Sequence, residues 1–308
     1  MRYDDIKLAL KASLAAGQAP TALVVSPTTR EILSSVRQAI RAGYIREAML
    51  VGDPALIPLE ADDPGHGLRI LAVDGEEAIL ATIRERLLQG HKDLVIKGNI
   101  SSGKLLRAVL SASTSKDDRL SHLYLLDSKS FPDWAIVISD AGVNIDPDLP
   151  TKAKIIDNAV RFARKIGYDH PRIALLSAVE TVNPAMQSSV DAAALRDMAK
   201  EGRFPHCHID GPMAIDAALS PRSAAAKSLA GEVAGRADIL ICPNIDSANS
   251  TAKALIGTTG RAMGVIYGGA GVPIAFPSRG DSEETRLDSI LLAASLAVSP
   301  PASAPAAG

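Results

Sequence analysis

The stretch on which the fold prediction turns lies late in the chain and reads GGAGVPIAFPSRGDSEET, residues 268–285. Its glycine-rich start leads into a short apolar strand over 273–276, and an amphipathic helix is predicted over 282–297. Between strand and helix stand Ser278, Arg279 and Asp281. Unpaired N–H groups at a helix start attract anions, and the arginine fork grips phosphate or an oxyanion. The junction is therefore predicted to handle an anion.

Working outward from this junction, aliphatic runs of strand length alternate with helical patterns along the chain. The other predicted strands are residues 21–25, 48–52, 68–73, 94–98, 123–126, 134–138, 173–178, 206–210, 238–242 and 263–267. The other predicted helices are residues 4–16, 29–42, 75–89, 102–112, 151–166, 185–201, 213–230, which is interrupted at Pro221, and 247–256. Such alternation is typical of βαβ units on a parallel sheet. Residues 123–126 and 134–138 follow one another without a helix, which predicts an antiparallel pair.

The polar segment 114–119 interrupts this pattern and is predicted to be the crossing between two α/β lobes. A chain of 308 residues suits one large or two medium domains. A ligand site between two such lobes collects strand ends from both of them. The tail 299–308 is rich in Pro, Ala and Ser and is predicted to be disordered.

Composition excludes several classes of function. Hydrophobic residues make up 47% and aromatic residues only 3%, which predicts an aliphatic core built on buried parallel strands. A net charge of −2 predicts no nucleic-acid partner. Cys207 and Cys242 form neither a disulfide framework nor a zinc site. The absence of a signal-peptide pattern and of a long apolar run predicts a cytoplasmic protein that does not enter the membrane.

A second glycine-rich stretch, Gly98–Lys104, fits the pattern G-x-x-x-x-G-K between a predicted strand and a predicted helix. The next residue, which in a phosphate loop is the Ser or Thr that holds Mg²⁺, is Leu105, and this disfavours a nucleoside-triphosphate site. Two interpretations stay open. Lys97, the loop amides and Arg107 bind an anion, or the segment is an ordinary turn with Lys104 facing solvent.

Polar residues also flank the strands of the second half of the chain. They are Ser121, His122, Asn144, Asp146, Glu180, Asn183, Asp210, Asp246 and Asn249. Each of them fits a turn or a helix cap, but together they are more numerous than solubility requires and predict a polar cleft. His206 and His208 share a strand face, yet nothing near them in the sequence completes a ligand set, so no metal site is predicted.

These motifs together resemble the phosphate acetyltransferase and phosphate butyryltransferase family. The resemblance rests on RLSH at 119–122, DAGVNI at 140–145, AVETVNP at 178–184, DGPMAID at 210–216, ADIL at 237–240, PNI at 243–245, Asn249, SRGDS at 278–282 and the pair Lys97-Gly98. It covers about residues 20 to 297, and the motifs occur in the family's order. Residues 179–184 and 281–287 look closer to the butyryltransferase branch.

The resemblance implies a reversible transfer in which acyl-CoA and phosphate give acyl phosphate and CoA. It implies a two-lobed, three-layer αβα fold similar to isocitrate and isopropylmalate dehydrogenases, with the active site in the interdomain cleft. The first lobe would combine residues 1–117 and 271–308, and the second would be residues 118–270. The implied protein is a homo-oligomer, a dimer or larger. It needs no metal and no cofactor beyond CoA or acyl-CoA as substrate.

The resemblance also implies roles for individual residues. Arg279 and Ser278 stabilise the oxyanion, and Asp281 joins them as a catalytic residue. The implied substrate-binding residues are Lys97, Gly98, Arg107, Ser121, Asn144, Glu180, Asp210, Asp246 and Asn249. In the acetyltransferase branch an aspartate six residues after the arginine is thought to deprotonate the CoA thiol, and Thr285 occupies that position here. Asp281 is the expected substitute, with Asp288 behind it, unless Asp281 only caps the last helix.

Two other functions stay open at this point. One is a non-catalytic module that binds CoA or an acyl phosphate. The other is an NAD-dependent decarboxylating dehydrogenase of the related fold, although the metal-binding aspartates that it needs cannot be assembled from the sequence. The preferred length of the acyl chain depends on the shape of a pocket, and one methylene changes selectivity by only about 1–3 kcal/mol.

Overall fold

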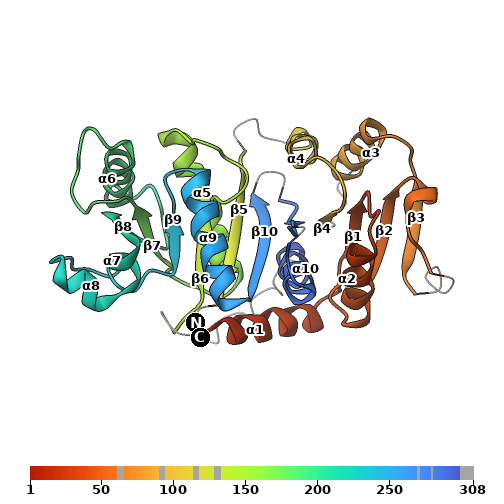
Figure 1. Cartoon of the computed structure of the whole chain (residues 1–308), viewed down its shortest axis with the longest axis horizontal. Helices are drawn as coiled ribbons and strands as arrows, with labels where there is room; N and C mark the ends of the chain where they lie inside the picture. Colours follow the sequence, from red (N-terminus) through yellow and green to blue (C-terminus); the bar gives the residue numbers. More distant parts are fainter. Residues whose placement is uncertain are drawn as a thin grey trace, which may run out of the picture. The chain divides into compact units, whose positions relative to one another are not determined.

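A computed structural model describes residues 1–60, 66–89, 94–113, 118–127, 133–268, 271–278 and 280–298. The chain divides into two compact units (Figure 1). Unit 1 consists of Met1–Ile6 and Ser121–Ala262, and unit 2 consists of Lys7–Leu120 and Met263–Gly308. The mixed α/β class agrees with the prediction. The polar break expected at 114–119 and the tail at 299–308 lie largely or wholly outside the described residues.

Two segments lie in a different unit from the lobe to which the sequence assigned them. Met1–Ile6 lie in unit 1, where the backbone N–H of Ala135 donates to the carbonyl of Met1 at 2.9 Å. Residues 263–268 lie in unit 2, because Val265 and Ile266 pair with Ala275 and Ile274 in an antiparallel ladder. Backbone pairing over long sequence separations decides both boundaries, and a single sequence does not display it.

Six strands form the sheet of unit 2, in the order β3-β2-β1-β4-β11-β10. Their bounds are β1 Thr21–Val25, β2 Glu47–Gly52, β3 Leu68–Ala72, β4 Leu94–Lys97, β10 Ala262–Gly268 and β11 Ile274–Ala275. The pairs from β3 to β11 are parallel and the β11–β10 pair is antiparallel. Because β1 and β4 lie inside this sheet, their side chains are buried on both faces, as the unbroken aliphatic runs predict.

The helices of unit 2 pack as two pairs, α2 with α10 and α3 with α4 (Figure 1). Their bounds are α2 Arg30–Arg41, α3 Glu76–Leu88, α4 Ser102–Ser111 and α10 Glu283–Ala297. A single 3₁₀ turn, η1, covers Pro54–Leu56, and α1 runs over Tyr3–Ala16 from unit 1 into unit 2. Most buried residues of α10 are aliphatic or small, and the helix packs against β4 and β11.

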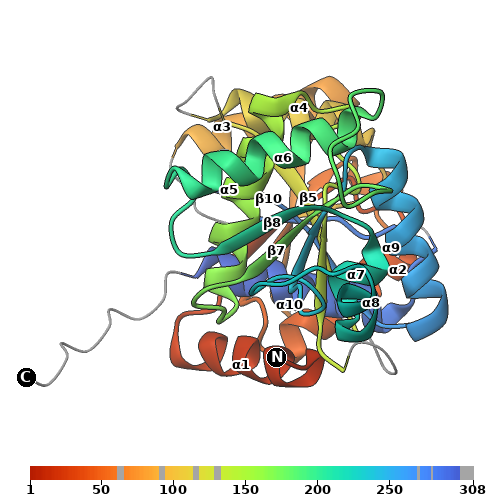
Figure 2. The ribbon, with the colours of Figure 1, turned by 90° about the vertical axis from the view of Figure 1, so that its left-hand side faces the viewer.

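Five strands form the sheet of unit 1, in the order β5-β6-β9-β7-β8. Their bounds are β5 Leu120–Leu126, β6 Ile136–Ser139, β7 Arg172–Leu176, β8 His208–Met213 and β9 Ile239–Ile241. β5 and β6 are antiparallel, which confirms the pair predicted from their direct succession, and the remaining pairs are parallel. Figure 2 shows β7 and β8 side by side, with α6 on one side of them and α7 and α8 on the other.

The helices of unit 1 are α5 Leu149–Lys165, α6 Gln187–Lys200, α7 Ile215–Leu219, α8 Pro221–Ala226 and α9 Ile245–Thr259. The segment predicted over 213–230 as a helix interrupted at Pro221 consists of two short helices, and α8 begins at Pro221, which confirms the predicted interruption. Ser220 ends α7 and caps α8, its hydroxyl accepting the N–H of Ser223, and Pro221 occupies the first turn of α8. Among the described residues no helix is long and apolar enough to cross a bilayer.

Candidate active site

The junction that decided the fold prediction is a tight loop between β11 and α10. The carboxylate of Asp281 accepts the backbone N–H of Ser278 at 2.8 Å, and the N–H of Asp281 donates to the carbonyl of Ser278 at 3.1 Å. Ser282 caps α10, its hydroxyl accepting the N–H of Thr285 at 3.1 Å. Asp281 therefore closes the loop, and the alternative that it caps the helix is wrong. Arg279 lies outside the described residues.

A cavity of about 200 Å³ opens beside this loop. It is lined by Thr29, Glu31, Ile32, Lys97, Gly98, Asn99, Pro277, Ser278 and Arg286. These residues come from the start of α2, the end of β4 with the loop after it, the loop after β11 and the first part of α10, all within unit 2. Parallel strands end at the same edge of a sheet, so β4 and β11 bring Lys97, Gly98 and Ser278 together although about 180 residues separate them in sequence.

Gly98 is required where the chain leaves β4. Its N–H donates to the carbonyl of Val25 at 2.9 Å, and a Cβ at this position would lie 2.3 Å from that oxygen and 2.4 Å from the carbonyl oxygen of Ser26. Both obstacles are backbone atoms, which cannot swing aside. The next residue, Asn99, donates its N–H to the Ser26 carbonyl at 2.8 Å and its side-chain amide to Thr28 at 3.2 Å. The absence of a side chain at 98 lets the β1 and β4 loops meet at the cavity.

The charged groups of the cavity suit an anionic ligand that also carries a proton to transfer. Lys97 Nζ lies 3.2 Å from the carbonyl of Gly98 and 5.4 Å from the centre of the Phe276 ring. Arg286 donates from Nη1 to the carbonyl of Asp281 at 2.6 Å. The carboxylate in the lining belongs to Glu31, in the first turn of α2. Two cationic residues and one carboxylate thus line the same cavity of about 200 Å³.

Sequence reasoning missed Glu31, Thr29 and Arg286 as members of this cavity. The hydroxyl-rich turn before α2 marked a helix start, but nothing in it showed which loop it would meet. Arg286 stands one turn into α10, where an arginine is ordinarily a solvated surface residue. A search for acidic residues in the first turns of helices that follow strands would have found Glu31, and it would also have found Glu76 and Glu77.

Lys104 and Arg107 lie elsewhere in unit 2. Lys104 Nζ contacts Glu76 at 2.5 Å and Glu77 at 3.3 Å, and the bond to Glu76 raises the lysine's pKa. Arg107 lines a separate shallow hollow between α3 and α4, together with Arg84 and Lys104. The structure therefore brings Lys97 and Gly98 to the Ser278 loop but leaves Arg107 and Lys104 on another surface. The turn after β4 is not wrapped around a single anion site.

The position of the acetyltransferase-branch aspartate is buried in unit 2. Thr285 is 3% exposed, and its hydroxyl is 3.1 Å from that of Ser282. One turn further on, Asp288 is 1% exposed and accepts Lys7 Nζ at 2.7 Å. Neither side chain is among those lining the cavity. Asp288 is held as the partner of a lysine in α1, which explains its burial without a catalytic task.

In unit 1 the DAGVNI motif forms a loop whose hydrogen bonds converge on one buried carboxylate. Asp140 is 3% exposed and accepts the backbone N–H groups of His122, Gly142, Val143 and Asn144 at 3.0–3.2 Å, as well as the side-chain amide of Asn144. Burial raises the pKa of Asp140, and the donated hydrogen bonds oppose that rise. The carboxylate is saturated with donors and holds the loop between β6 and α5 against β5.

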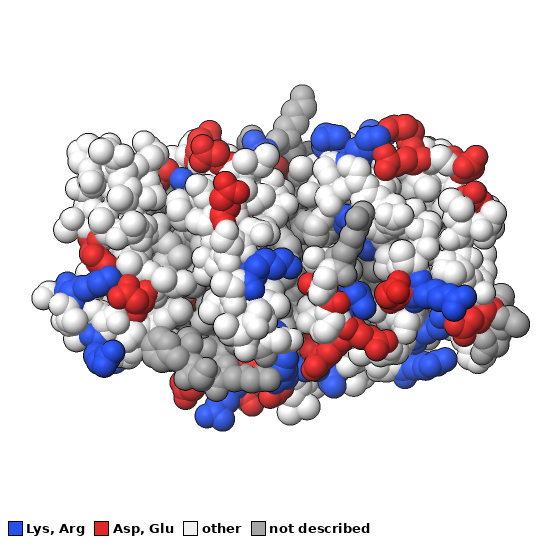
Figure 3. All heavy atoms as spheres, in the orientation of Figure 1, with Lys and Arg blue, Asp and Glu red and all other residues white. Residues whose placement is uncertain are grey.

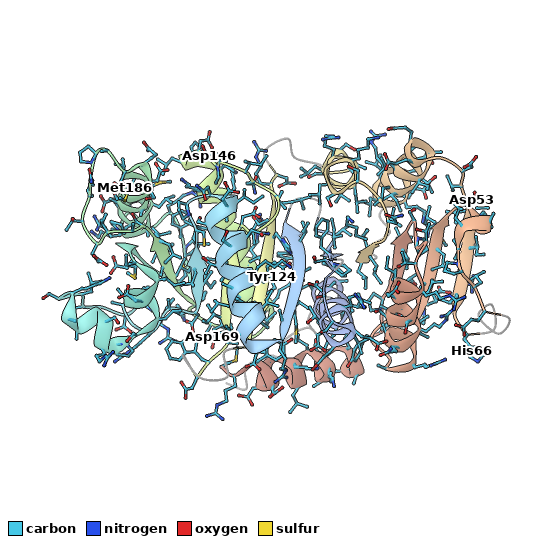
Figure 4. The ribbon with its side chains drawn as sticks, viewed as in Figure 1. Asp53, His66, Tyr124, Asp146, Asp169 and Met186 are labelled. Carbon is cyan, nitrogen blue, oxygen red and sulfur yellow. The ribbon has the colours of Figure 1, made fainter. Side chains whose placement is uncertain are left out.

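His122 lies beside this loop, and its backbone N–H is one of the donors to Asp140. Its ring centre lies 4.4 Å from that of Tyr124, and burial together with the positive charge of Lys253 lowers the pKa of His122 to about 3. Lys253 Nζ stands 5.6 Å from the centre of the Tyr124 ring, which Figure 4 labels on β5 behind α9. A Cβ on Gly142 would lie 2.4 Å from His122 Nδ1. The histidine is therefore a neutral core residue at physiological pH.

The other predicted substrate-binding residues of unit 1 are dispersed. Ser121 is buried and accepts from Asn158 at 2.9 Å, and Asn249 donates to the Ala141 carbonyl at 3.0 Å. Glu180 pairs with Lys227, which also binds Asp216. Asp210 accepts the N–H of Gly211 at 2.8 Å, and Asp246 is exposed in the first turn of α9. Asn144 and Asn249 both contact the Asp140 loop.

Within the described ranges no group of three or more His, Cys, Asp or Glu side chains is placed to hold a metal ion. The face seen in Figure 3 carries basic and acidic side chains interspersed, without a large patch of one sign. Asp146, labelled in Figure 4 in the loop before α5, projects away from the strands.

Comparison with known proteins gives the family. The family model described as "Phosphate acetyl/butaryl transferase" matches residues 72–294. The chain is 37% identical to phosphate butyryltransferase of Clostridium acetobutylicum over 86% of its own length and 89% of that protein, and 32% identical to phosphate acetyltransferase of Rhizobium meliloti over 95% and 92%. A branched-chain phosphotransacylase from Enterococcus faecalis V583 has a similar structure, with a TM-score of 0.77, 28% identity and coverage of 90% of this chain and 99% of that one. The chain belongs to the phosphate acetyl/butyryl transferase family.

Proposed function

We propose that this acyltransferase moves a short acyl group, from acetyl to butyryl, reversibly between CoA and inorganic phosphate by direct attack in a ternary complex. The observation that carries the proposal is the cavity of unit 2, where Lys97 and Arg286 stand beside the Ser278 loop. Both substrates are anionic, and a cavity lined by two cationic residues suits a phosphate or an acyl phosphate. The family's members include both butyryl- and acetyltransferases, which supports the range of acyl groups.

The reaction in either direction passes through a tetrahedral oxyanion next to a phosphate. Arg279 and Ser278 are proposed to stabilise that charge, Arg279 with its guanidinium and Ser278 with its hydroxyl. Loss of one such donor costs about 3–4 kcal/mol in other acyl-transfer enzymes. Asp281 fixes the loop through the Ser278 amide, and its role as proton acceptor stays a prediction. The binding of CoA and phosphate side by side supplies most of the remaining acceleration through orientation.

The thiols of the chain support direct transfer over a covalent acyl-cysteine. Burial raises the pKa of Cys207 to about 11 and that of Cys242 to about 12. The nucleophilic form of cysteine is the thiolate, which requires a lowered pKa. Neither cysteine is among the residues that line the cavity of unit 2. The acyl group is therefore proposed to pass from one substrate to the other without an enzyme-bound intermediate.

Several finer statements from the sequence stay predictions. They are the isocitrate/isopropylmalate dehydrogenase-like arrangement with its site in the interdomain cleft, catalysis without metal or a bound cofactor, a homo-oligomer and a cytoplasmic location. Among the predicted binding residues, Lys97 and Gly98 gain support because they line the cavity with Ser278. Arg107, Ser121, Asn144, Glu180, Asp210, Asp246 and Asn249 stay predictions as substrate contacts.

The test is CoA-dependent release of phosphate from acetyl, propionyl and butyryl phosphate, with the reverse reaction followed as loss of the thioester. We expect turnover with at least one of the three, and a decrease in kcat of roughly 10²–10³-fold in Arg279→Ala. Arg41→Ala, at the exposed end of α2, is the matched control and should keep wild-type activity. Tight CoA binding without turnover, unchanged by Arg279→Ala, would show instead a non-catalytic binding module.

A further inference from the structure

We propose that Glu31 is the catalytic base that takes the proton of the CoA thiol. The inference rests on the proposed acyl transfer and concerns a residue that the sequence did not single out. A thiol with a pKa of about 8.5 is mostly protonated near pH 7, so a positioned base accelerates its attack. The residue at the position of the acetyltransferase-branch aspartate is Thr285, which cannot accept a proton in this way. The proton acceptor must come from another element.

The placement of Glu31 fits that task. Its side chain lines the cavity that also contains Ser278, the residue next to Arg279, and Lys97 at the end of β4. The charged groups that share the cavity with it are Lys97 and Arg286. Glu31 is exposed, and the described part of the chain engages its carboxylate in no hydrogen bond or ion pair. An unoccupied carboxylate in a cavity is ready to receive a proton from a bound substrate.

The acidic residues of α10 and of the loop before it are already engaged. Asp281 holds the Ser278 amide, and Asp288 is buried against Lys7. Glu283 accepts the Ser34 hydroxyl at 3.0 Å and the side-chain amide of Gln38. Glu284 lies 3.6 Å from Lys7 Nζ. None of these four carboxylates lines the cavity. Among the described residues, Glu31 is the one whose carboxylate both belongs to the cavity lining and forms no hydrogen bond or ion pair.

The step balances as follows. Towards acyl-CoA, the S–H bond breaks, its proton goes to Glu31, and the sulfur electron pair forms a C–S bond with the acyl carbon. The tetrahedral intermediate then collapses, the C–O bond to phosphate breaks, and phosphate leaves with that electron pair. Glu31 afterwards releases the proton to water. In the opposite direction phosphate attacks the thioester, and protonated Glu31 returns its proton to the departing thiolate.

The experiment measures kcat and KM for CoA from pH 5.5 to 9.5 in the wild type, Glu31→Gln and Glu31→Asp, with butyryl phosphate as acyl donor. We expect Glu31→Gln to lower kcat about 10²-fold at pH 6.5 while KM for CoA stays within about twofold. The deficit should shrink as pH approaches 8.5, because the thiolate then forms without help. Glu31→Asp should recover part of the activity with the wild-type pH profile.

The control is Glu77→Gln, a glutamate in the first turn of α3 that lines a different hollow, and it should leave the profile unchanged. A deficit of Glu31→Gln that is constant across pH, or appears in KM alone, overturns the proposal in favour of a binding role. If Asp281→Asn shows the pH-dependent deficit and Glu31→Gln does not, the base is Asp281. Inactivity of the wild type with all three acyl phosphates would refute the proposed function itself. This outcome differs from a failure of the Glu31 proposal, which would show only in the variants while the wild type stays active.

Discussion

In both units polar residues follow the inner strands. In unit 2 they border a cavity, whereas in unit 1 they are buried and hydrogen-bonded within the protein. In unit 2, Lys97 and Ser278 border a cavity of about 200 Å³, and Glu31 in its lining has no partner in the described part of the chain. In unit 1, the carboxylate of Asp140 accepts five hydrogen bonds at 3% exposure, and the neighbouring His122 is packed on Tyr124.

The difference distinguishes polar groups that can bind a ligand from polar groups that the fold itself requires. A buried polar group must be satisfied by the protein, and a group that is fully satisfied has nothing left for a ligand. A group at a cavity can stay unsatisfied because water or substrate completes it. Polar strand ends therefore mark a functional site only where the fold leaves a hollow next to them. The predictions below test this contrast, from the largest expected effect to the smallest.

The first test compares the two close-packed glycines, Gly98 and Gly142. Gly98→Ala should lower the free energy of unfolding by about 3 kcal/mol or more and abolish activity, because its Cβ meets the backbone oxygens of Val25 and Ser26. Gly142→Ala should cost less, about 1–3 kcal/mol, because the nearest atoms to its Cβ belong to the side chain of His122 and not to the backbone. Urea denaturation of both variants measures the difference, and an equal cost would contradict it.

The second test removes the charge of Asp140, which accepts the hydrogen bonds of the buried loop in unit 1. Asp140→Asn should destabilise the protein by about 3 kcal/mol, because the amide that replaces one carboxylate oxygen turns a donor toward the N–H groups that the oxygen accepted. Denaturant unfolding gives the value. If the loop is structural, the folded variant should keep KM for CoA and phosphate within about twofold. A folded variant with unchanged stability and a large rise in KM would make Asp140 a ligand contact.

The third test uses the depressed pKa of His122. The ring has a pKa of about 3 in the folded protein and about 6.5 when unfolded, so between these values the unfolded chain binds more protons. Stability should therefore fall as pH decreases from 6.5 towards 3, with a slope approaching ~1.4 kcal/mol per pH unit. His122→Gln should reduce that slope in denaturant titrations.

The comparison with His122→Gln is needed because Asp140 acts in the opposite sense. Its pKa is raised in the folded state, so its contribution to stability falls as pH rises above the ordinary aspartate value near 3.8. The two groups partly cancel in the wild-type curve. Identical slopes for the wild type and His122→Gln would show that the histidine does not titrate on unfolding.

Much of the fold could be predicted from the sequence because local patterns and tertiary structure agree. The runs at 21–25 and 94–98 are aliphatic throughout and became inner strands, and the helix over 29–42 ends within a residue of its prediction. The exceptions have long-range causes. Residues 263–268 join unit 2 through an antiparallel pairing with Ile274 and Ala275, and no local pattern announces a partner strand. The first residues are placed by the same kind of contact, since the N–H of Ala135 donates to the carbonyl of Met1.

The candidate site was predicted less completely. Lys97, Gly98 and Ser278 were found because each follows a strand in a recognisable motif, and the structure brings them to one cavity. Glu31 and Arg286 were missed because a charged residue in a helix turn is usually a solvated one, and only the three-dimensional path of the loops shows what it faces. Asp140 and Ser121 illustrate the reverse case, in which a motif residue is buried and already bonded.

The last and smallest effect distinguishes two lysines near the same turn. Lys97→Met should raise KM for phosphate about tenfold, because it removes one cation from the cavity while the alkyl chain keeps its packing on Phe276. Lys104→Met should change KM less than twofold, since its ammonium group pairs with Glu76 and Glu77 outside the cavity, and exposed pairs of this kind contribute little to stability. Steady-state kinetics with phosphate as the varied substrate measures both. A larger effect at Lys104 would favour the phosphate-loop interpretation of Gly98–Lys104, because only a ligand lying along that loop would feel both lysines.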